Sequence, residues 1–449
     1  MIDKNASGAP RIRDNWNYAW VVLAIGTLCE FGAVGMGRFG YGMLIPAMQA
    51  SLGMSNTEAG ALATANLIGY LAMSALGGAL ATRFGPRIVI GLGVLVSGLG
   101  MVLTGFAAGP LTAAVWRAVT GVGTGGVNVP TMGLVSAWFS HKRRGMAVGI
   151  LLGGNAAALI VSGVLFPKIL TDLGDNGWRM CWYLVGGLTL VTSIIGLTLL
   201  RNPFTRKGLI LRREQSATDT TVAADKTTAS GSPKEAITTD ESGTAPSDKS
   251  TLNWKLVYRS GPVMHLGLVY LTYGFSYIIF ITFFTKRLMA DMDYTKEAAG
   301  ALFMLLGWLS LICGGLWGWF SDRFGRKPAI IAVYLIQTTS IALLATTGST
   351  VTVVLSAIMF GLSSWSVPAI MAATCADAVG PRMAPAALGL ITLFFGVGQA
   401  VGPTVAGAMA DASGNFDNAF WLAAAIGAIG TLGVLPLRRK SISAACREF

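Results

Sequence analysis

Three ionisable residues lie inside long apolar stretches of the sequence. Glu30 and Arg38 fall in the run 18–47, and Arg117 falls in the run 110–139. A charge surrounded by lipid or apolar side chains costs about 3 kcal/mol or more, so each is a candidate functional group. A guanidinium held there can bind an oxyanion through paired N–H donors. A buried carboxylate favours its protonated form and can carry a proton. The chemistry these residues offer is therefore anion binding and proton transfer.

Other polar side chains in the apolar runs could complete such a site. Three tyrosines at i, i+3 and i+7 share one helix face, and either cavity lining or plain packing explains this stripe: Tyr270, Tyr273 and Tyr277. Arg38 could instead reach the membrane surface, and Arg117 could simply join helices. The predicted substrate-binding residues are Arg38, Asn66, Arg117, Asn128, Tyr273, Tyr277 and Gln399, and Glu30 is predicted to carry the coupling proton.

The composition indicates the class of protein. Of 449 residues, 53% are hydrophobic and only 12% are charged, whereas soluble proteins carry about 25% charged residues. The five cysteines form no C-x-x-C pair, so we expect neither disulfides nor a metal site. Gly121, Gly123 and Gly126 match G-x-G-x-x-G but lie in an apolar run rather than after a strand. No P-loop or hydrolase motif is present, so we expect a membrane protein that is not an enzyme and has no cofactor.

The apolar runs predict the elements that must position these residues. A membrane-spanning helix needs about 20 apolar residues. Twelve runs qualify: 18–47, 58–82, 87–108, 110–139, 143–167, 179–200, 262–288, 297–320, 328–347, 350–378, 382–410 and 417–437. We expect Pro130 and Pro368 to break the fourth and tenth helices.

The predicted fold is all-α, with twelve transmembrane helices in two pseudo-symmetric six-helix bundles. The expected parts are a cytoplasmic N-tail at 1–17, a bundle at 18–200, a largely disordered cytoplasmic linker at 201–261, a second bundle at 262–437 and a cytoplasmic C-tail at 438–449.

The distribution of Lys and Arg predicts the orientation. With the N-terminus inside, the inner segments hold 26 of these residues and the outer segments hold five, while Arg38 and Arg117 lie within spans. Positive residues concentrate on the cytoplasmic side of membrane proteins. The protein is therefore expected to lie in the cell (inner) membrane with both termini in the cytoplasm. The same bias accounts for the net charge of +12 without a nucleic-acid partner.

An internal repeat relates the two halves at an offset of 240 residues. Residues 78–87 read Gly-Ala-Leu-Ala-Thr-Arg-Phe-Gly-Pro-Arg, and residues 318–327 read Gly-Trp-Phe-Ser-Asp-Arg-Phe-Gly-Arg-Lys. Both copies resemble the loop signature of the major facilitator superfamily, G-x-x-x-D-R-x-G-R-[RK], with departures at Thr82 and Pro86. The resemblance implies gating roles for Gly78, Arg83, Gly85, Arg87, Asp322, Arg323, Gly325 and Arg326.

The first half of the chain also resembles one branch of this superfamily. Ala137-Trp-Phe139, followed by Arg143-Arg-Gly-Met-Ala-Val-Gly149, is similar to the monocarboxylate and oxalate–formate branch. That branch often carries a cation near Arg38 and an arginine in helix eight, where this chain has Gly314. The resemblance implies a carboxylate substrate.

The resemblance further implies a latch at the cytoplasmic face. By the repeat, Asp322 is expected to approach the start of helix five, near Arg143, Arg144 and Gly145. Thr82, at the equivalent position, can offer only a hydroxyl to the start of helix eleven, near Met383. A carboxylate beside a helix N-terminus is favourable by about 0.3–1 kcal/mol when exposed.

These observations predict a monomeric secondary active transporter in the lipid bilayer. We expect it to move a small organic anion, such as a monocarboxylate, by alternating access and in symport with protons. One alternative is an exporter of amphiphilic compounds, although Arg38 disfavours a cationic substrate and the fifth span lacks the antiporter pattern G-P-x-x-G-G. Another is a non-transporting sensor or scaffold on the same fold.

Overall fold

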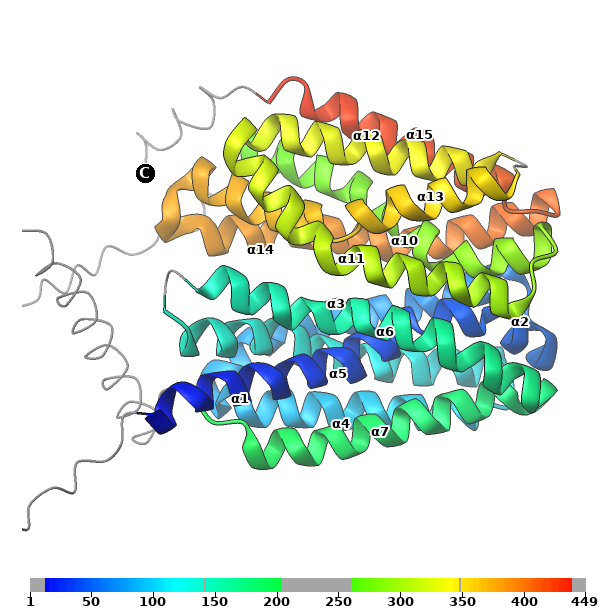
Figure 1. Ribbon diagram of the computed structural model, residues 1–449, viewed down its shortest axis with the longest axis horizontal. Helices are drawn as coiled ribbons and strands as arrows, with labels where there is room; N and C mark the ends of the chain where they lie inside the picture. The colour runs from blue at the N-terminus through cyan, green and yellow to red at the C-terminus, as the bar shows by residue number, and fades with distance from the viewer. Residues whose placement is uncertain (1–12, 141–142, 203–259, 347–348, 438–449) are drawn as a thin grey trace, which may run out of the picture.

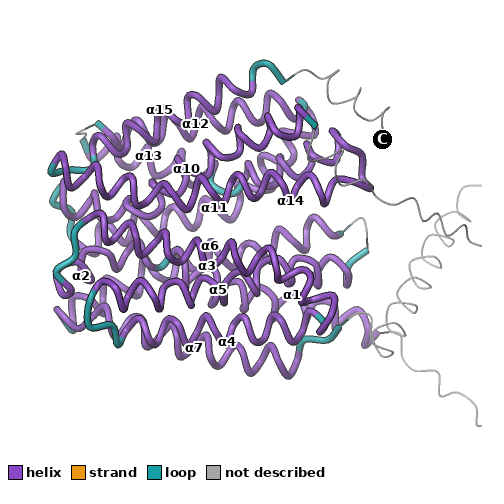
Figure 2. Tube along the Cα trace, turned by 180° about the vertical axis from the view of Figure 1, so that it is seen from behind, coloured by secondary structure: helices purple, strands orange, loops and turns teal. Residues whose placement is uncertain are grey.

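The described part of the protein is made of helices joined by short turns. The computed structural model describes residues 13–140, 143–202, 260–346 and 349–437, and no strand occurs among them (Figure 2). The expected tails and linker lie largely outside these ranges. The helices are α1 (Arg13–Cys29), η1 (Glu30–Phe39), α2 (Tyr41–Leu52), α3 (Asn56–Phe84), α4 (Pro86–Gly105), α5 (Pro110–Trp138), α6 (Arg144–Asp172), η2 (Gly174–Asn176), α7 (Gly177–Leu199), α10 (Gly261–Asp291), α11 (Lys296–Phe324), α12 (Arg326–Ala345), α13 (Thr350–Ser363), α14 (Ser366–Ser413) and α15 (Asp417–Val434).

Most of these helices are suited to a membrane. Eleven segments of the described residues are long and apolar enough to cross one. Helix α5 is long enough, at 29 residues, but is not among them. Its five glycines and four threonines make it less apolar, while letting its neighbours approach closely. The structure therefore has many candidate spans, and the count of twelve stays a prediction.

The first span is not the single regular helix that its apolar run predicts. Residues Glu30–Phe39 form a π-helix, and its end is marked by the bond from Gly40 N–H to the Gly35 carbonyl at 3.3 Å. Such i→i+5 segments are rare and occur frequently at functional sites. The segment carries both Glu30 and Arg38, so the wider turn changes which way each side chain faces.

The two proline breaks were predicted wrongly, whereas the separation of two spans near residue 380 is confirmed. Pro130 lies inside the continuous helix α5. The break in the tenth helix lies at Ser364 and Trp365, before Pro368, which sits in the first turn of α14. A proline is tolerated in a first turn because the N–H it lacks would have no helical partner there.

Helix α14 is helical over 48 residues, and it contains parts of two candidate spans, Thr350–Cys375 and Ala387–Ser413, which are separated near residue 380 as expected. It reverses direction on the way. Asp377 pairs with Arg326 at the first turn of α12, whereas Asp411 bonds to the first turn of α3 at the other end of the molecule. Figure 1 shows α14 turning back at the end where α1 begins.

The helices form two groups that pack within themselves. Helices α1 to α7 make one group and α10 to α15 the other (Figure 1). We call the end at which α1 begins and α15 ends the terminal end, and the other the opposite end. Between the groups, α6 packs on α11, α3 on α14 and α2 on α10.

Two seams between the groups close at the opposite end through backbone contact. In the α6–α11 seam, a Cβ on Gly163 would lie 2.5 Å from the carbonyl oxygen of Gly300, and one on Gly307 would lie 2.8 Å from that of Ala156. In the α3–α14 seam, a Cβ on Gly60 would overlap the carbonyl of Pro403. Only glycine allows helices to approach this closely.

The same two seams are open at the terminal end. Glycines near that end have no atom of another element within 4 Å of where a Cβ would be: Gly145 and Gly149 on α6, Gly314 and Gly318 on α11, Gly78 on α3 and Gly389 on α14. In Figure 1 the ribbons of the two groups diverge in this direction. The described residues therefore hold the groups together at the opposite end and apart at the terminal end.

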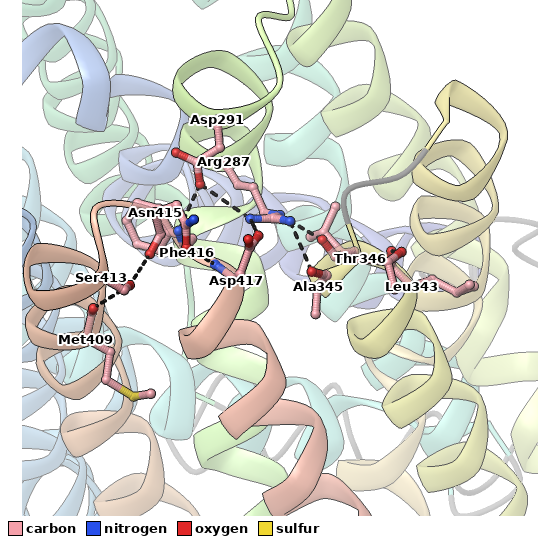
Figure 3. A network of polar contacts seen from close by, with 11 residues as sticks. Arg287, Asp291, Leu343, Ala345, Thr346, Met409, Ser413, Asn415, Phe416 and Asp417 are labelled. Atoms are coloured by element: carbon pink, nitrogen blue, oxygen red, sulfur yellow. Dashed lines mark hydrogen bonds and ion pairs between the residues drawn. The ribbon is translucent and has the colours of Figure 1, made fainter.

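A buried arginine ties the second group together near the opposite end (Figure 3). Arg287 of α10 pairs with Asp417 of α15 at 2.6 Å and with Asp291 at 3.4 Å, and it donates to the Leu344 and Ala345 carbonyls of α12. These are among the last carbonyls of α12, which have no partner within that helix. The Arg287 side chain thus provides hydrogen-bond donors for the C-terminal carbonyls of α12 and joins α12 to α10 and α15.

Candidate functional site

Arg38 lies where the two helix groups meet. Its Nη2 donates to Oε1 of Gln399, on α14, at 2.6 Å. Its guanidinium lies over the rings of Phe39 and Tyr70, each 5.2 Å from the ring centroid. Its Nε has no hydrogen-bond partner among the described residues, and no carboxylate there pairs with it. Arg38 therefore keeps an uncompensated positive charge between the two groups.

Glu30 is fully buried eight residues earlier on the same helix. Its Oε2 accepts a hydrogen bond from Nδ2 of Asn128 at 3.2 Å, and its Oε1 has no partner in the described residues. Oδ1 of Asn128 faces the hydroxyl of Tyr70 at a long 3.4 Å. Since the Tyr70 ring lies under Arg38, the contacts run from Arg38 through Tyr70 and Asn128 to Glu30. Glu30 and Arg38 do not pair directly.

Arg117 is buried more completely than Arg38. Its Nη1 donates to the Gly37 carbonyl of η1 at 2.5 Å, and its guanidinium lies between Tyr41, 4.7 Å from the ring centroid, and Trp182, at 5.0 Å. Nδ2 of Asn66 donates to the Arg117 carbonyl at 3.1 Å. These contacts join helices η1, α2, α3, α5 and α7, so Arg117 has a packing role whatever else it does.

A small cavity brings together three of the residues predicted to bind substrate. Arg38, Asn66 and Arg117 line it, with residues of α2 and α10 closing the other side. It offers about 10 Å³ to the centre of a water molecule, roughly the room that one water needs. Unpartnered polar atoms of all three residues are buried: Nε of Arg38, Oδ1 of Asn66 and Nε of Arg117. The structure thus groups these residues, while their role in binding stays a prediction.

The tyrosine stripe of α10 forms a stacked column. The ring centroids of Tyr270 and Tyr273 lie 6.1 Å apart, and those of Tyr273 and Tyr277 lie 5.7 Å apart. The Tyr273 hydroxyl donates to the Ser364 carbonyl at 2.6 Å, so it supports the helix break. The buried Tyr277 hydroxyl has no partner among the described residues. Of the two tyrosines predicted to bind substrate, only Tyr277 keeps its hydroxyl available.

The loop signatures form the turns after α3 and α11. Gly85 and Gly325 have φ values of 87° and 98°, which a residue with a side chain rarely adopts. Arg83 and Arg323 lie over the rings of Phe84 and Phe324, which follow them. No atom of another element comes within 4 Å of a Cβ built on Gly78.

The remaining signature residues bond within their own helix group. Arg87 donates through Nε to the Leu197 carbonyl at 2.7 Å and through its backbone N–H to Asn202 at 2.9 Å. Arg326 pairs with Asp322 at 2.6 Å and with Asp377 at 3.2 Å. Asp322 thus contacts its own group, because the terminal ends of the seams are apart. The side chain of Met383 lies outside the described part of the chain.

Two residues beside Arg38 were missed in the sequence. Tyr70 lies one helical turn after Asn66 on the same face of α3, and this spacing could have found it. Trp365 lies at the break between α13 and α14, and its ring meets that of Phe39 edge-on at 5.1 Å. Pro368 indicates a break in this region but not its exact position, so the sequence alone did not single out Trp365.

Comparison with known proteins decides the family. A family model described as Major Facilitator Superfamily matches residues 23–295, more than half of the chain. The chain belongs to the major facilitator superfamily. A second model, described as the uncharacterised MFS-type transporter YbfB, matches residues 241–435. The protein is therefore a multi-pass membrane transporter and not an enzyme, as the sequence predicted.

Individual members of the superfamily are similar along much of the chain. A probable sulfoacetate transporter, SauU, from Cupriavidus necator is 25% identical over 444 residues, which cover 92% of this chain and 94% of the relative. Monocarboxylate transporter 11 from Homo sapiens is 31% identical over 184 residues, 41% of this chain and 38% of that protein. The inward open structure of the E. coli xylose transporter XylE matches with a TM-score of 0.70 and 16% identity, covering 95% of this chain and 99% of that one.

Proposed function

We propose that this protein is a secondary active transporter of a small organic anion, coupled to protons. The observation that carries the proposal is Arg38, a positive charge held between the two helix groups without a carboxylate partner among the described residues. A charge left uncompensated away from water is costly, and a bound oxyanion compensates it. Names of relatives that transport sulfoacetate or monocarboxylates agree with an acidic substrate.

Glu30 is the proposed proton carrier. It is fully buried, and its only hydrogen-bond partner among the described residues is the uncharged amide of Asn128. A carboxylate in such surroundings favours the protonated form. Tyr70 and Asn128 lie between Glu30 and Arg38, so protonation at one can affect anion binding at the other. This arrangement supports symport of the anion with a proton.

Alternating access is the proposed transport cycle. It involves twelve spans in two pseudo-symmetric six-helix bundles, 18–200 and 262–437, with the terminal end in the cytoplasm. The closed opposite end and the open terminal end then correspond to an inward-facing state. The loop-signature residues act as the cytoplasmic gate, and Asp322 joins the start of α6 only when the terminal end closes. We further propose that the transporter works as a monomer.

A ligand screen on the purified transporter tests the anion class. The probes are benzoate and sulfoacetate, and the neutral comparisons are benzamide, which matches benzoate in shape, and xylose. A ligand that binds the folded state raises its stability, by about 2.7 kcal/mol at 100 times its dissociation constant. At least one acid should raise the unfolding temperature of the wild-type protein but not of Arg38→Ala. Stabilisation by the neutral compounds alone, or by the acids equally in both proteins, would overturn the proposal.

A further inference from the structure

Two buried hydrogen-bond donors near Arg38 have no partner among the described residues. They are the hydroxyl of Tyr277 on α10 and Nε1 of Trp365 at the helix break. Nε of Arg38 is a third such donor. A buried polar group without a partner costs free energy, and most such groups in native proteins are paired. Three such donors in this part of the structure therefore require an explanation.

The three groups lie close to one another but come from different elements. The Trp365 ring meets the Phe39 ring edge-on at 5.1 Å and the Tyr277 ring at 5.7 Å, measured between centroids. Phe39 follows Arg38 directly and lies 5.2 Å from its guanidinium. The side chains of Arg38, Phe39, Trp365 and Tyr277 therefore form a continuous series of neighbours between the two helix groups.

The backbone carbonyls at the helix break do not accept hydrogen bonds from these donors. Its free carbonyls already have partners: the Leu362 carbonyl accepts from Trp317 Nε1 at 2.8 Å, and the Ser364 carbonyl accepts from the Tyr273 hydroxyl at 2.6 Å. The nearby backbone is therefore satisfied by other side chains. Trp365 and Tyr277 therefore remain as unpaired donors beside the break among the described residues. Substrate sites of transporters are often formed by interrupted helices such as this one.

The chemistry of the three groups specifies their ligand. Arginine and the tryptophan indole are donors only, and a tyrosine hydroxyl can donate. A carboxylate or sulfonate offers several acceptor lone pairs and no donor, so it matches all three, and Arg38 adds the compensating charge. An ammonium group also has only donors, so it could not accept hydrogen bonds from these three groups. The set therefore discriminates between ligands by hydrogen-bond direction as well as by charge.

We propose that Tyr277 and Trp365 donate hydrogen bonds to the acidic group of the substrate while Arg38 pairs with its charge. This inference rests on the proposed anion transport and adds its recognition chemistry. The substrate class is a small acid with one carboxylate or sulfonate at this position and a short flat body. The body lies against the rings that adjoin it, Phe39 and the tyrosine column of α10. Because the donors come from both helix groups, the acid binds across the seam between them.

Substitutions that keep each ring but remove each donor test this inference. Trp365→Phe removes the indole N–H, and Tyr277→Phe removes the hydroxyl. Trp319→Phe on α11, whose side chain is 61% exposed, is the matched control. Dissociation constants of benzoate and sulfoacetate are measured calorimetrically on purified protein. Each of the first two variants should bind the preferred acid about 10- to 100-fold more weakly, the loss expected for a hydrogen bond to a charged group, while Trp319→Phe binds as wild type.

A double-mutant cycle separates direct recognition from loss of packing. If both donors bind the same acidic group, their effects on affinity should be coupled. The fold loss of affinity in the double variant Trp365→Phe with Tyr277→Phe should then differ from the product of the two single fold losses. Near-wild-type binding in both single variants, with binding lost in Arg38→Ala, would overturn the inference and leave the proposed function standing. Independent losses that simply multiply would also overturn it. Failure of the wild type to bind either acid would remove both proposals.

Discussion

Thr57 donates a 2.5 Å hydrogen bond through Oγ1 to Oδ2 of Asp411, which ties the start of α3 to the end of α14. The residues 240 positions away repeat this contact in the other seam with the roles exchanged. There Thr171 of α6 donates to Glu297 of α11 at 2.7 Å. Asp411 also accepts from the backbone N–H groups of Asn56 and Thr57, each at 2.8 Å, and so caps α3. The two seams are therefore closed by the same kind of bond, but more bonds converge on Asp411.

This difference predicts that the two seams contribute unequally to keeping the opposite end closed. Asp411→Asn weakens three bonds and should shift the balance toward the state open at that end by about 5- to 30-fold, equivalent to one or two kcal/mol. Glu297→Gln affects one exposed bond and should shift it less. Leu111 and Val351 lie in the first turns of α5 and α13, at the opposite end of the molecule. The distance between spin labels at these two residues reports the opening of that end. Equal shifts in the two variants would argue against this unequal contribution.

The register of the α6–α11 seam predicts contacts in the other state. Steps of seven residues lead from Gly163 through Ala156 to Gly149 on α6, and from Gly300 through Gly307 to Gly314 on α11. The first two pairs touch at the opposite end, and the third is apart. If the terminal end closes in the same register, Gly149 should meet Gly314.

Cysteine cross-linking tests that register. Gly149→Cys with Gly314→Cys should form a disulfide, since such bonds require Cα atoms about 4.4–6.8 Å apart, and oxidation should stop transport until a reductant is added. Gly149→Cys with Gly318→Cys, one turn out of register, is the control and should cross-link far less. Efficient cross-linking of the control pair, or uninterrupted transport by the linked protein, would rule out this closure.

Glu30→Gln should separate coupling from binding. The amide keeps the shape and the contact with Asn128 but cannot exchange a proton. Exchange of labelled benzoate across proteoliposomes should persist, whereas accumulation driven by a more acidic outside should fall to the equilibrium level. Glu58→Gln, at the N-terminal cap of α3, is the carboxylate control. Unchanged pH-driven accumulation in Glu30→Gln would remove Glu30 from the coupling mechanism.

Arg287 should contribute to stability rather than to transport. Arg287→Met keeps much of the side-chain volume but leaves two carboxylates and the end of α12 without their cation. We expect a loss of about 2–3 kcal/mol, below the usual figure for a buried pair because the carboxylates are partly exposed, at 14% and 28%. Thermal unfolding in detergent measures this, with Lys286→Met as the neighbouring control. A similar loss in both variants would contradict a specific role for the Arg287 network.

The sequence predicts the helices better than it predicts the site. Hydrophobic length alone located the apolar helices, and the repeat located the turns at Gly85 and Gly325, because both are local properties. The π-helix at Glu30 and the break at Trp365 depend on tertiary packing, so an ideal helical period could not reveal them. The bond between Arg38 and Gln399 joins residues 361 positions apart, and only the assembled helices bring them together.

Arg38 is the residue that the proposed anion transport requires most. The most direct measurement is counterflow of labelled benzoate and sulfoacetate in proteoliposomes that contain the wild type, Arg38→Lys or Arg38→Ala, each verified to be folded. The wild type should show saturable counterflow of at least one acid. Arg38→Lys, which keeps the charge but loses the bidentate geometry, should retain partial activity, and Arg38→Ala should have none. Counterflow at the wild-type rate and affinity in Arg38→Ala would rule out Arg38 as the anion-binding residue.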